Sequence, residues 1–175
     1  MYEHFEGPFG QPECNGSTAA TVSITLHLFP LPYHHNAYFL AQAAQAIGRS
    51  ANSSQIWTWM EAVFANQGEF GNAATESMTA AQVKSKCADL AETAGIERDV
   101  VSKGLNDEQM DGNTRFGWKY ACYRGVFGTP TFFVNQVPAP AEAAGWSAKQ
   151  WITFVNTLQG RTTFSTFLDS DTKLY

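Results

Sequence analysis

Residues 125–135 read Gly-Val-Phe-Gly-Thr-Pro-Thr-Phe-Phe-Val-Asn, and no other stretch of the chain is as informative. Small residues lead into Thr129-Pro130, and this pair leads directly into a run of strongly β-forming residues. The fixed φ angle of proline and its missing N–H suit the first residue of a strand. The residues alone leave two interpretations open: an ordinary trans turn into a strand, or a cis Thr129–Pro130 bond held by its surroundings.

The chain before this stretch predicts one strand followed by a long helical block. Residues 22–28 alternate strictly, with Val22, Ile24, Leu26 and Leu28 on one face, which is typical of a strand. Pro30 and Pro32 end it, because neither can donate to a strand ladder. In the second helix an apolar stripe is expected to be buried, namely Ile56, Trp59, Met60, Val63 and Phe64. Five helices are expected, at about residues 36–48, 56–64, 79–94, 97–103 and 107–124.

Strand chemistry returns at residues 131–134. Asn135-Gln136 is a candidate tight turn, and Val137 could begin a short return strand. A last helix is predicted after Ser147, with Gln150 completing a capping box. Trp146 and Trp151 occupy the two positions of a hydrophobic staple around the same helix start, and Gly160 ends the helix.

The composition predicts a folded chain and disfavours several classes of partner. Of the 175 residues 44% are apolar, which is enough for a core, and only 15% are charged. The net charge is −5 and no Lys/Arg run is present, so nucleic-acid binding is not expected. No apolar run approaches the roughly 18–20 residues that span a bilayer, so no membrane association is expected. Residues 1–20 do not resemble a signal peptide, and the sequence does not indicate the cellular compartment of the protein.

Cys14, Cys87 and Cys122 form no C-x-x-C pair and have no metal-ligand spacing. One disulfide with a free thiol and three unpaired thiols are both compatible with the sequence. Cys87 lies among apolar residues and is expected to be a small buried hydrophobe. Cys14 has no partner cysteine and precedes Asn15-Gly16 instead of a helix, so a reactive thiol is not expected there. Cys122, late in the fifth helix, is ambiguous.

His34-His35 invites a metal interpretation, which the spacing does not favour. Adjacent histidines diverge on either a helix or a strand, and no other ligand pair has supporting spacing. We therefore expect no metal and no cofactor, and we assign no catalytic residue.

Residues 29–37 (FPLPYHHNA) and residues 125–135, at either end of the helical block, resemble the DsbA-like branch of the thioredoxin superfamily. The resemblance covers roughly residues 20–158. It implies an α/β, thioredoxin-like three-layer fold with an inserted all-helical domain. The core would comprise residues 21–35 and 125–160, and the helical insertion residues 36–124. Residues 1–20 would form an irregular lead-in and residues 161–175 a C-terminal tail.

One part of the family pattern is missing from the sequence. In the family, a first strand and a helix beginning with C-x-x-C or C-x-x-S precede the second strand. Only about twenty residues precede Val22, and residues 1–6 resemble the end of that first helix. We therefore expect an N-terminally incomplete fold. Because the missing strand is central in the family, residues 22–28 must pair directly with residues 131–134 or expose an apolar edge.

The resemblance makes Thr129 and Pro130 the substrate-binding residues. In thioredoxin-like proteins the backbone beside the cis-proline pairs with an extended peptide, or with the backbone of glutathione. The expected partner is thus an extended peptide or a thiol-containing protein at this cis-proline loop. The chain resembles thiol-disulfide oxidoreductases but lacks the redox cysteine pair, so it is not expected to be redox-active as it stands. The alternatives are a non-catalytic peptide- or partner-binding module and, resting on His34-His35 alone, an unrelated helical metal or cofactor protein.

Overall fold

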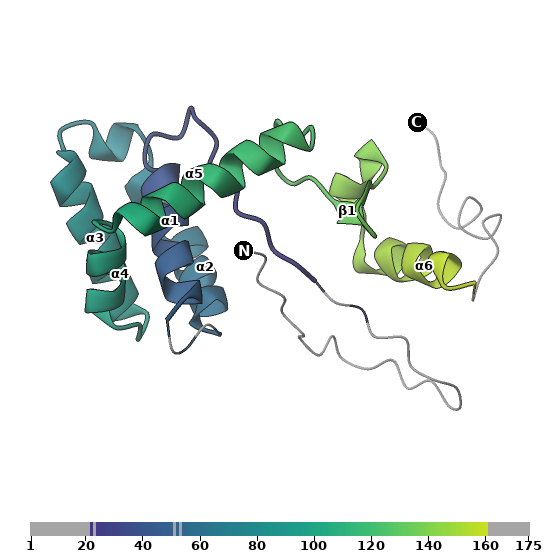
Figure 1. Ribbon diagram of the computed structural model, residues 1–175, viewed down its shortest axis with the longest axis horizontal. Helices are drawn as coiled ribbons and strands as arrows, with labels where there is room; N and C mark the ends of the chain where they lie inside the picture. The colour runs from purple at the N-terminus through teal and green to yellow at the C-terminus, as the bar shows by residue number, and fades with distance from the viewer. Residues whose placement is uncertain (1–21, 23, 51, 53, 161–175) are drawn as a thin grey trace. The chain divides into compact units, whose positions relative to one another are not determined.

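The computed structural model describes residues 22, 24–50, 52 and 54–160, which form two compact units. In its described part the first unit, which we call the helical unit, runs over Ile24–Phe127 (Figure 1). The second, the C-terminal unit, comprises Val22 and residues 128–160 in its described part, and it holds a small sheet and one α-helix there. The lead-in and the tail expected at residues 1–20 and 161–175 lie outside the described residues.

The helical unit contains the five α-helices that the sequence predicts. Two short 3₁₀ turns, which the sequence analysis did not predict, connect the second helix to the third. The elements are α1 (Ala37–Gly48), α2 (Gln55–Ala65), η1 (Gln67–Phe70), η2 (Ala73–Thr75), α3 (Ala80–Thr93), α4 (Arg98–Gly104) and α5 (Glu108–Tyr123).

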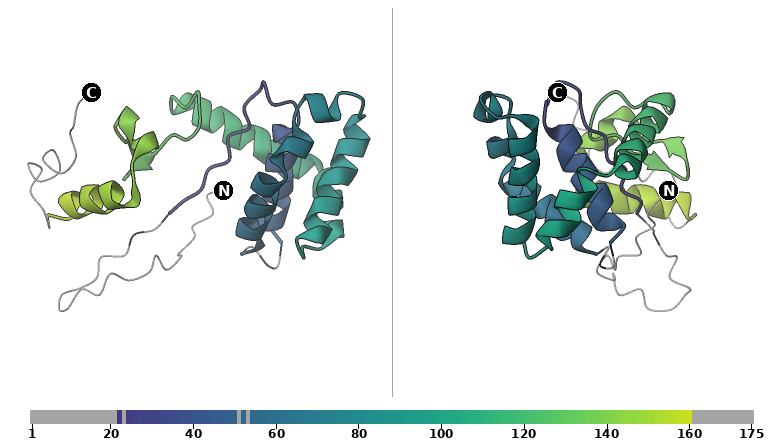
Figure 2. Two further views of the ribbon diagram at one scale, coloured as in Figure 1. Left: turned by 180° about the vertical axis from the view of Figure 1, so that it is seen from behind. Right: turned by 60° about the vertical axis from the view of Figure 1, so that its left-hand side comes forward.

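Helix α1 is the central element of this unit. It contacts α2, α3, α4 and α5, an arrangement that can be followed from the front and from behind (Figure 1, Figure 2). Ala43, Ala44 and Ile47 of α1 are buried, and the small side chains of the two alanines let neighbouring helices approach closely. Much of the remaining core comes from the surrounding helices and the residues next to them, including Trp59, Val83, Cys87, Ala91, Val101 and Leu105.

The beginning of α1 is fixed by a buried amide. Asn36 precedes the helix, as predicted, but its side chain does not cap α1. Instead, Asn36 Nδ2 donates hydrogen bonds to the carbonyl oxygen of Phe70 at 3.0 Å and to Thr75 Oγ1 at 2.7 Å. The amide therefore joins the start of α1 to the two 3₁₀ turns.

Helix α4 packs unusually close to α1 at one glycine. A Cβ atom added to Gly104 would overlap the Cβ atom of Ala46. On the same side, Gln42 Nε2 donates a 2.9 Å hydrogen bond to the Gly104 carbonyl oxygen. The two backbones can come this close because Gly104 has no side chain.

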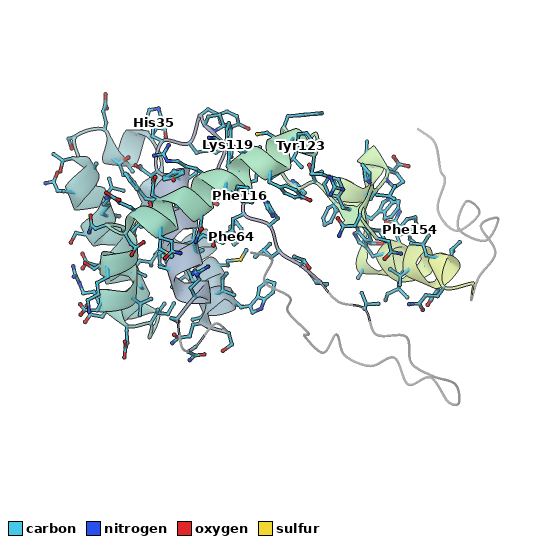
Figure 3. The ribbon with its side chains drawn as sticks, in the orientation of Figure 1. His35, Phe64, Phe116, Lys119, Tyr123 and Phe154 are labelled. Carbon is cyan, nitrogen blue, oxygen red and sulfur yellow. The ribbon has the colours of Figure 1, made fainter. Side chains whose placement is uncertain are left out.

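Of the five residues in the predicted stripe on α2, two are buried, two are half-buried and one is exposed. The buried residues are Ile56 and Trp59, whereas Phe64 is 64% exposed. Only the first two turns of α2 bury a side chain completely, so the prediction for Phe64, in the last turn, is wrong. The aromatic side chains of Phe116 and Tyr123 also project from α5 into solvent (Figure 3).

The strand predicted at residues 22–28 is not formed. Apart from an isolated bridge at Ile24, residues 24–28 carry no regular structure, and Val22 and Ile24 are exposed. A strand needs a paired neighbour, and the sheet of the described residues holds only β1 and β2. The segment packs on α5 instead: His27 Nε2 donates a 2.9 Å hydrogen bond to the Gly117 carbonyl oxygen, and Phe29 stacks on Trp118.

The C-terminal unit begins with an antiparallel hairpin. Strand β1 (Phe133–Val134) pairs with β2 (Val137–Pro138) in the register Phe133 to Pro138 and Val134 to Val137. Asn135 and Gln136 have φ angles of 49° and 69°, so the predicted turn is a mirror-image turn that matches strand twist. Both the turn and the short return strand are thus confirmed.

A 3₁₀ turn, η3 (Ala141–Gly145), links the hairpin to helix α6 (Ala148–Leu158). The predicted capping box is present: Gln150 N donates to Ser147 Oγ, and Ser147 N donates to Gln150 Oε1. The Trp146 and Trp151 rings meet edge to face with centroids 4.9 Å apart, which confirms the staple. Over the described part of the chain, no helix has the length and apolar character that a bilayer crossing requires.

Candidate peptide-binding loop

The loop that precedes β1 carries the two residues that the sequence analysis selected. The peptide bond between Thr129 and Pro130 is cis, and both residues are exposed. The bond is the one cis peptide bond that the structure records in its described residues. Two exposed residues joined by a cis bond thus stand shortly before the first strand of the hairpin.

Two contacts hold the loop at its ends. Thr131 Oγ1 donates a 2.7 Å hydrogen bond to the carbonyl oxygen of Gly128, which closes the turn around Thr129 and Pro130. On the strand side, Ala139 N donates a 2.9 Å hydrogen bond to the Phe132 carbonyl oxygen and extends the pairing of β1 and β2 toward the loop. The role of Thr131 was not predicted, although a threonine hydroxyl often donates a hydrogen bond to a backbone carbonyl three or four residues earlier in the chain.

An aromatic cluster lies directly behind the loop within the same unit. The Phe132 and Trp151 rings have centroids 4.8 Å apart. Phe154, labelled in Figure 3, packs against Trp146 with centroids 5.1 Å apart. Tilted and edge-to-face contacts of this kind are favourable for aromatic rings, so the cluster fixes Phe132 and with it the end of the loop.

Thr129 has main-chain groups available for pairing. Among the described residues, none donates a hydrogen bond to its carbonyl oxygen or accepts one from its amide. An exposed N–H and C=O beside a strand can bind another extended chain through backbone hydrogen bonds. This chemistry needs no particular side chain on the ligand.

The described cysteines are not arranged as a redox pair. Cys87 is completely buried on α3, as the sequence predicts, and burial raises the pKa of its thiol to about 12. Cys122 is exposed near the end of α5, and both thiols are free. Cys14 lies outside the described residues.

His34 and His35 take part in the turn that leads into α1. The His34 ring meets the Tyr33 ring with centroids 4.8 Å apart, and the His34 carbonyl oxygen accepts a 2.9 Å hydrogen bond from Ala37 N. His35 N donates a 3.0 Å hydrogen bond to Asn72 Oδ1. In the described ranges, no three His, Cys, Asp or Glu side chains come together as metal ligands would.

The comparisons with known proteins agree with one another on the fold. The sequence model of the DSBA-like thioredoxin domain matches residues 27–159. A crystal structure from Pseudomonas syringae, provisionally named a protein-disulfide isomerase, is similar with a TM-score of 0.66 and 16% identity, over 77% of this chain and 75% of that one. No curated protein matches the chain in sequence. The predicted thioredoxin-like fold with its helical insertion is therefore confirmed, and the chain belongs to the family of DSBA-like thioredoxin domains.

Proposed function

We propose that this chain is a peptide-binding member of its family, which holds an extended segment at the loop of Thr129 and Pro130. The observation that carries the proposal is that Thr129 is exposed and that its amide and carbonyl form no hydrogen bond within the described residues. The loop also stands directly before β1, so a bound segment would add to existing strand geometry.

We further propose that the cysteines of this sequence do not exchange disulfides with the bound segment. Efficient exchange requires an accessible thiolate, and its pKa is lowered most often by a helix N-terminus and a second cysteine three residues on. The sequence contains no such pair, and the raised pKa of Cys87 works against thiolate formation. Cys122 stands near the end of α5, and no second cysteine lies three residues before or after it.

Family membership favours a second candidate, an oxidoreductase of the DsbA type. The similar structure from Pseudomonas syringae is provisionally named an isomerase, but the likeness at 16% identity concerns the fold alone. A thiol-containing peptide or protein would be the natural ligand under both candidates. What separates them is whether a disulfide is exchanged.

A titration with two matched peptides tests the binding proposal. The probe is a cysteine-containing octapeptide of β-forming residues, and its control is the same peptide with alternate amides N-methylated. We expect the probe to shift the NMR amide signals of Thr129 and Thr131, with no change in the middle of α6, and the methylated control to have no effect. Binding of both peptides with equal affinity, or shifts that avoid residues 128–132, would overturn the proposal.

A disulfide-reduction assay separates the two candidates. The 175-residue chain is expected to leave the rate of insulin reduction by dithiothreitol unchanged. Turnover that is abolished by Cys14→Ala or Cys122→Ala would instead support the oxidoreductase.

A further inference from the structure

Helices α3 and α4 pack against each other and border an open cavity of about 300 Å³ within the helical unit. This volume is at the lower end of the range for small-molecule sites. Its wall comes from the first turns of α3, from α4 and from the segment after α4. The lining residues are Ala80, Ala81, Lys84, Ser85, Arg98, Ser102 and Asn106.

The polar groups of this wall are suited to an anion. Lys84 and Arg98 are cationic and Ser85 and Ser102 supply hydroxyls, whereas the amide of Asn106 is engaged by Lys84 and by the Ser102 carbonyl oxygen. The lining contains no carboxylate. This composition contrasts with the chain as a whole, whose net charge is −5. The side chains that line the cavity are therefore either cationic or neutral, and several carry hydrogen-bond donors.

Lys84 keeps its positive charge available. Its Nζ donates a 3.1 Å hydrogen bond to Asn106 Oδ1, a neutral acceptor, and lies 5.7 Å from the centroid of the Phe39 ring. In the described part of the chain it forms no ion pair with a carboxylate. The nearby carboxylate of Asp111 is already held by two hydrogen bonds from Arg115. The ammonium group is thus positioned by its contacts without being neutralised by them.

Arg98 is positioned differently. Its Nε and Nη2 donate to Asp89 Oδ1 at 3.0 Å and 2.8 Å, and Nη2 also donates to Ser85 Oγ at 3.1 Å. Asp89 and, at 3.9 Å, the carboxylate of Glu92 pair with this guanidinium, so they fix it and offset much of its charge, although neither residue lines the cavity. Arg98 is therefore a fixed hydrogen-bond donor, whereas Lys84 is the cation that no carboxylate of the described residues pairs with.

The beginning of α3 adds a third favourable contribution. Ala80 and Ala81 lie in the first turn of this helix, where backbone amides have no acceptor within the helix. The positive end of the helix dipole lies at the same place. Cations, hydroxyls and the first turn of α3 thus border the same cavity.

We propose that this cavity binds a small molecule through an oxyanion group, phosphate or carboxylate. The site is independent of the peptide-binding loop, because every residue that forms it belongs to the helical unit. Lys84 would supply the charge and Ser85, Ser102 and the start of α3 the hydrogen bonds.

NMR titration of the full chain with three small probes at about 0.15 M salt tests the proposal. Phenyl phosphate and benzoate distinguish the two oxyanions, and benzamide is the neutral control. We expect saturable shifts of the Ala80, Ala81 and Ser102 amides with at least one anion and none with benzamide. No saturable shift with either anion, or equal shifts with benzamide, would overturn the proposal.

Substitutions on the two helices make the test specific. Lys84→Met should weaken anion binding about tenfold, because a charged hydrogen-bond donor is lost, whereas Lys84→Arg should retain it. Lys103→Met is the matched control, since Lys103 lies outside the wall and pairs with Asp99. Equal weakening by Lys84→Met and Lys103→Met would show only diffuse electrostatic attraction and would contradict the site. Loss of anion binding in a folded Lys84→Arg variant would contradict it as well.

Discussion

The hydroxyl of Tyr38 donates a 2.8 Å hydrogen bond to Asp111 Oδ1 and so links α1 to α5. The same hydroxyl lies 2.9 Å from the Asp111 carbonyl oxygen. Arg115 donates to both carboxylate oxygens of Asp111, and its guanidinium carbon lies 5.2 Å from the Tyr38 ring centroid. Burial and the Asp111 hydrogen bond raise the pKa of Tyr38 to about 12, while hydrogen bonds from Arg115 and Tyr38 lower the pKa of Asp111.

Replacing Tyr38 by Phe should lower the free energy of unfolding by about 1 kcal/mol, because a hydrogen bond to a charged acceptor is lost while the ring remains. The value lies below the usual range of about 1.5–3 kcal/mol for hydrogen bonds to charged groups because the Asp111 side chain is 37% exposed to solvent. Urea unfolding at pH 7 measures the change. Tyr123→Phe, at a position 87% exposed, is the control and should change stability little. Equal effects of the two variants would contradict the role of the Tyr38 bond.

The stability difference between the wild type and Tyr38→Phe should shrink at alkaline pH. Above about pH 10 the unfolded wild type ionises Tyr38, whereas the folded protein keeps the proton until about pH 12. The folded state then binds more protons, so the free energy of unfolding of the wild type falls as the pH rises through this window. The variant lacks this titration. Urea unfolding of both proteins between pH 8 and pH 11 gives the comparison, and a difference that stays constant would contradict the raised pKa.

Alkylation should distinguish the two described cysteines. In a Cys14→Ala background, iodoacetamide is expected to modify the exposed Cys122 in the native protein and to reach Cys87 only after unfolding. Raising the pH to 9 should not make Cys87 reactive, because its buried thiol has a pKa of about 12 and stays protonated. Peptide mass spectrometry reads out the modified sites. Rapid native modification of Cys87 would show that the α3 core opens readily.

Gly104→Ala should destabilise the helical unit by about 1–3 kcal/mol, the usual cost of overpacking a tight core. The added methyl would overlap Ala46, and this clash exceeds the gain in helix propensity of roughly 1 kcal/mol. Ala46→Gly should restore much of the loss when combined with Gly104→Ala. A double-mutant cycle from urea unfolding measures this coupling, and additive effects would place the strain elsewhere.

The parts of the fold that were predictable depend on neighbouring residues in the sequence. The capping boxes at Thr79 and Ser147 each form within three residues, so the local pattern was sufficient to place the starts of α3 and α6. The Trp146 and Trp151 staple is equally local. The mirror-image turn at Asn135-Gln136 follows from the same principle, although Gln136 is an unusual residue at positive φ.

The features that could not be predicted depend on contacts between segments that are distant in the sequence. The alternation in residues 22–28 is a strand pattern, but pairing is a property of two segments, and this one packs on α5 through His27 and Phe29. For the candidate loop, the string around Thr129 and Pro130 was recognisable, whereas the anchoring of Phe132 by Trp151 required the folded helix α6. Lys84 and Arg98 share a cavity only because α3 and α4 pack together, and no motif connects the two residues.

The distribution of tryptophans gives each unit its own optical signal. Trp59 is 1% exposed in the helical unit and donates a 3.2 Å hydrogen bond from Nε1 to the Leu40 carbonyl oxygen, whereas Trp151 belongs to the aromatic cluster of the C-terminal unit. A variant that retains only Trp59 would report by fluorescence on the melting of the helices. One that retains only Trp151 would report on the hairpin and α6. The cooperativity of the two units can thus be measured separately within one polypeptide.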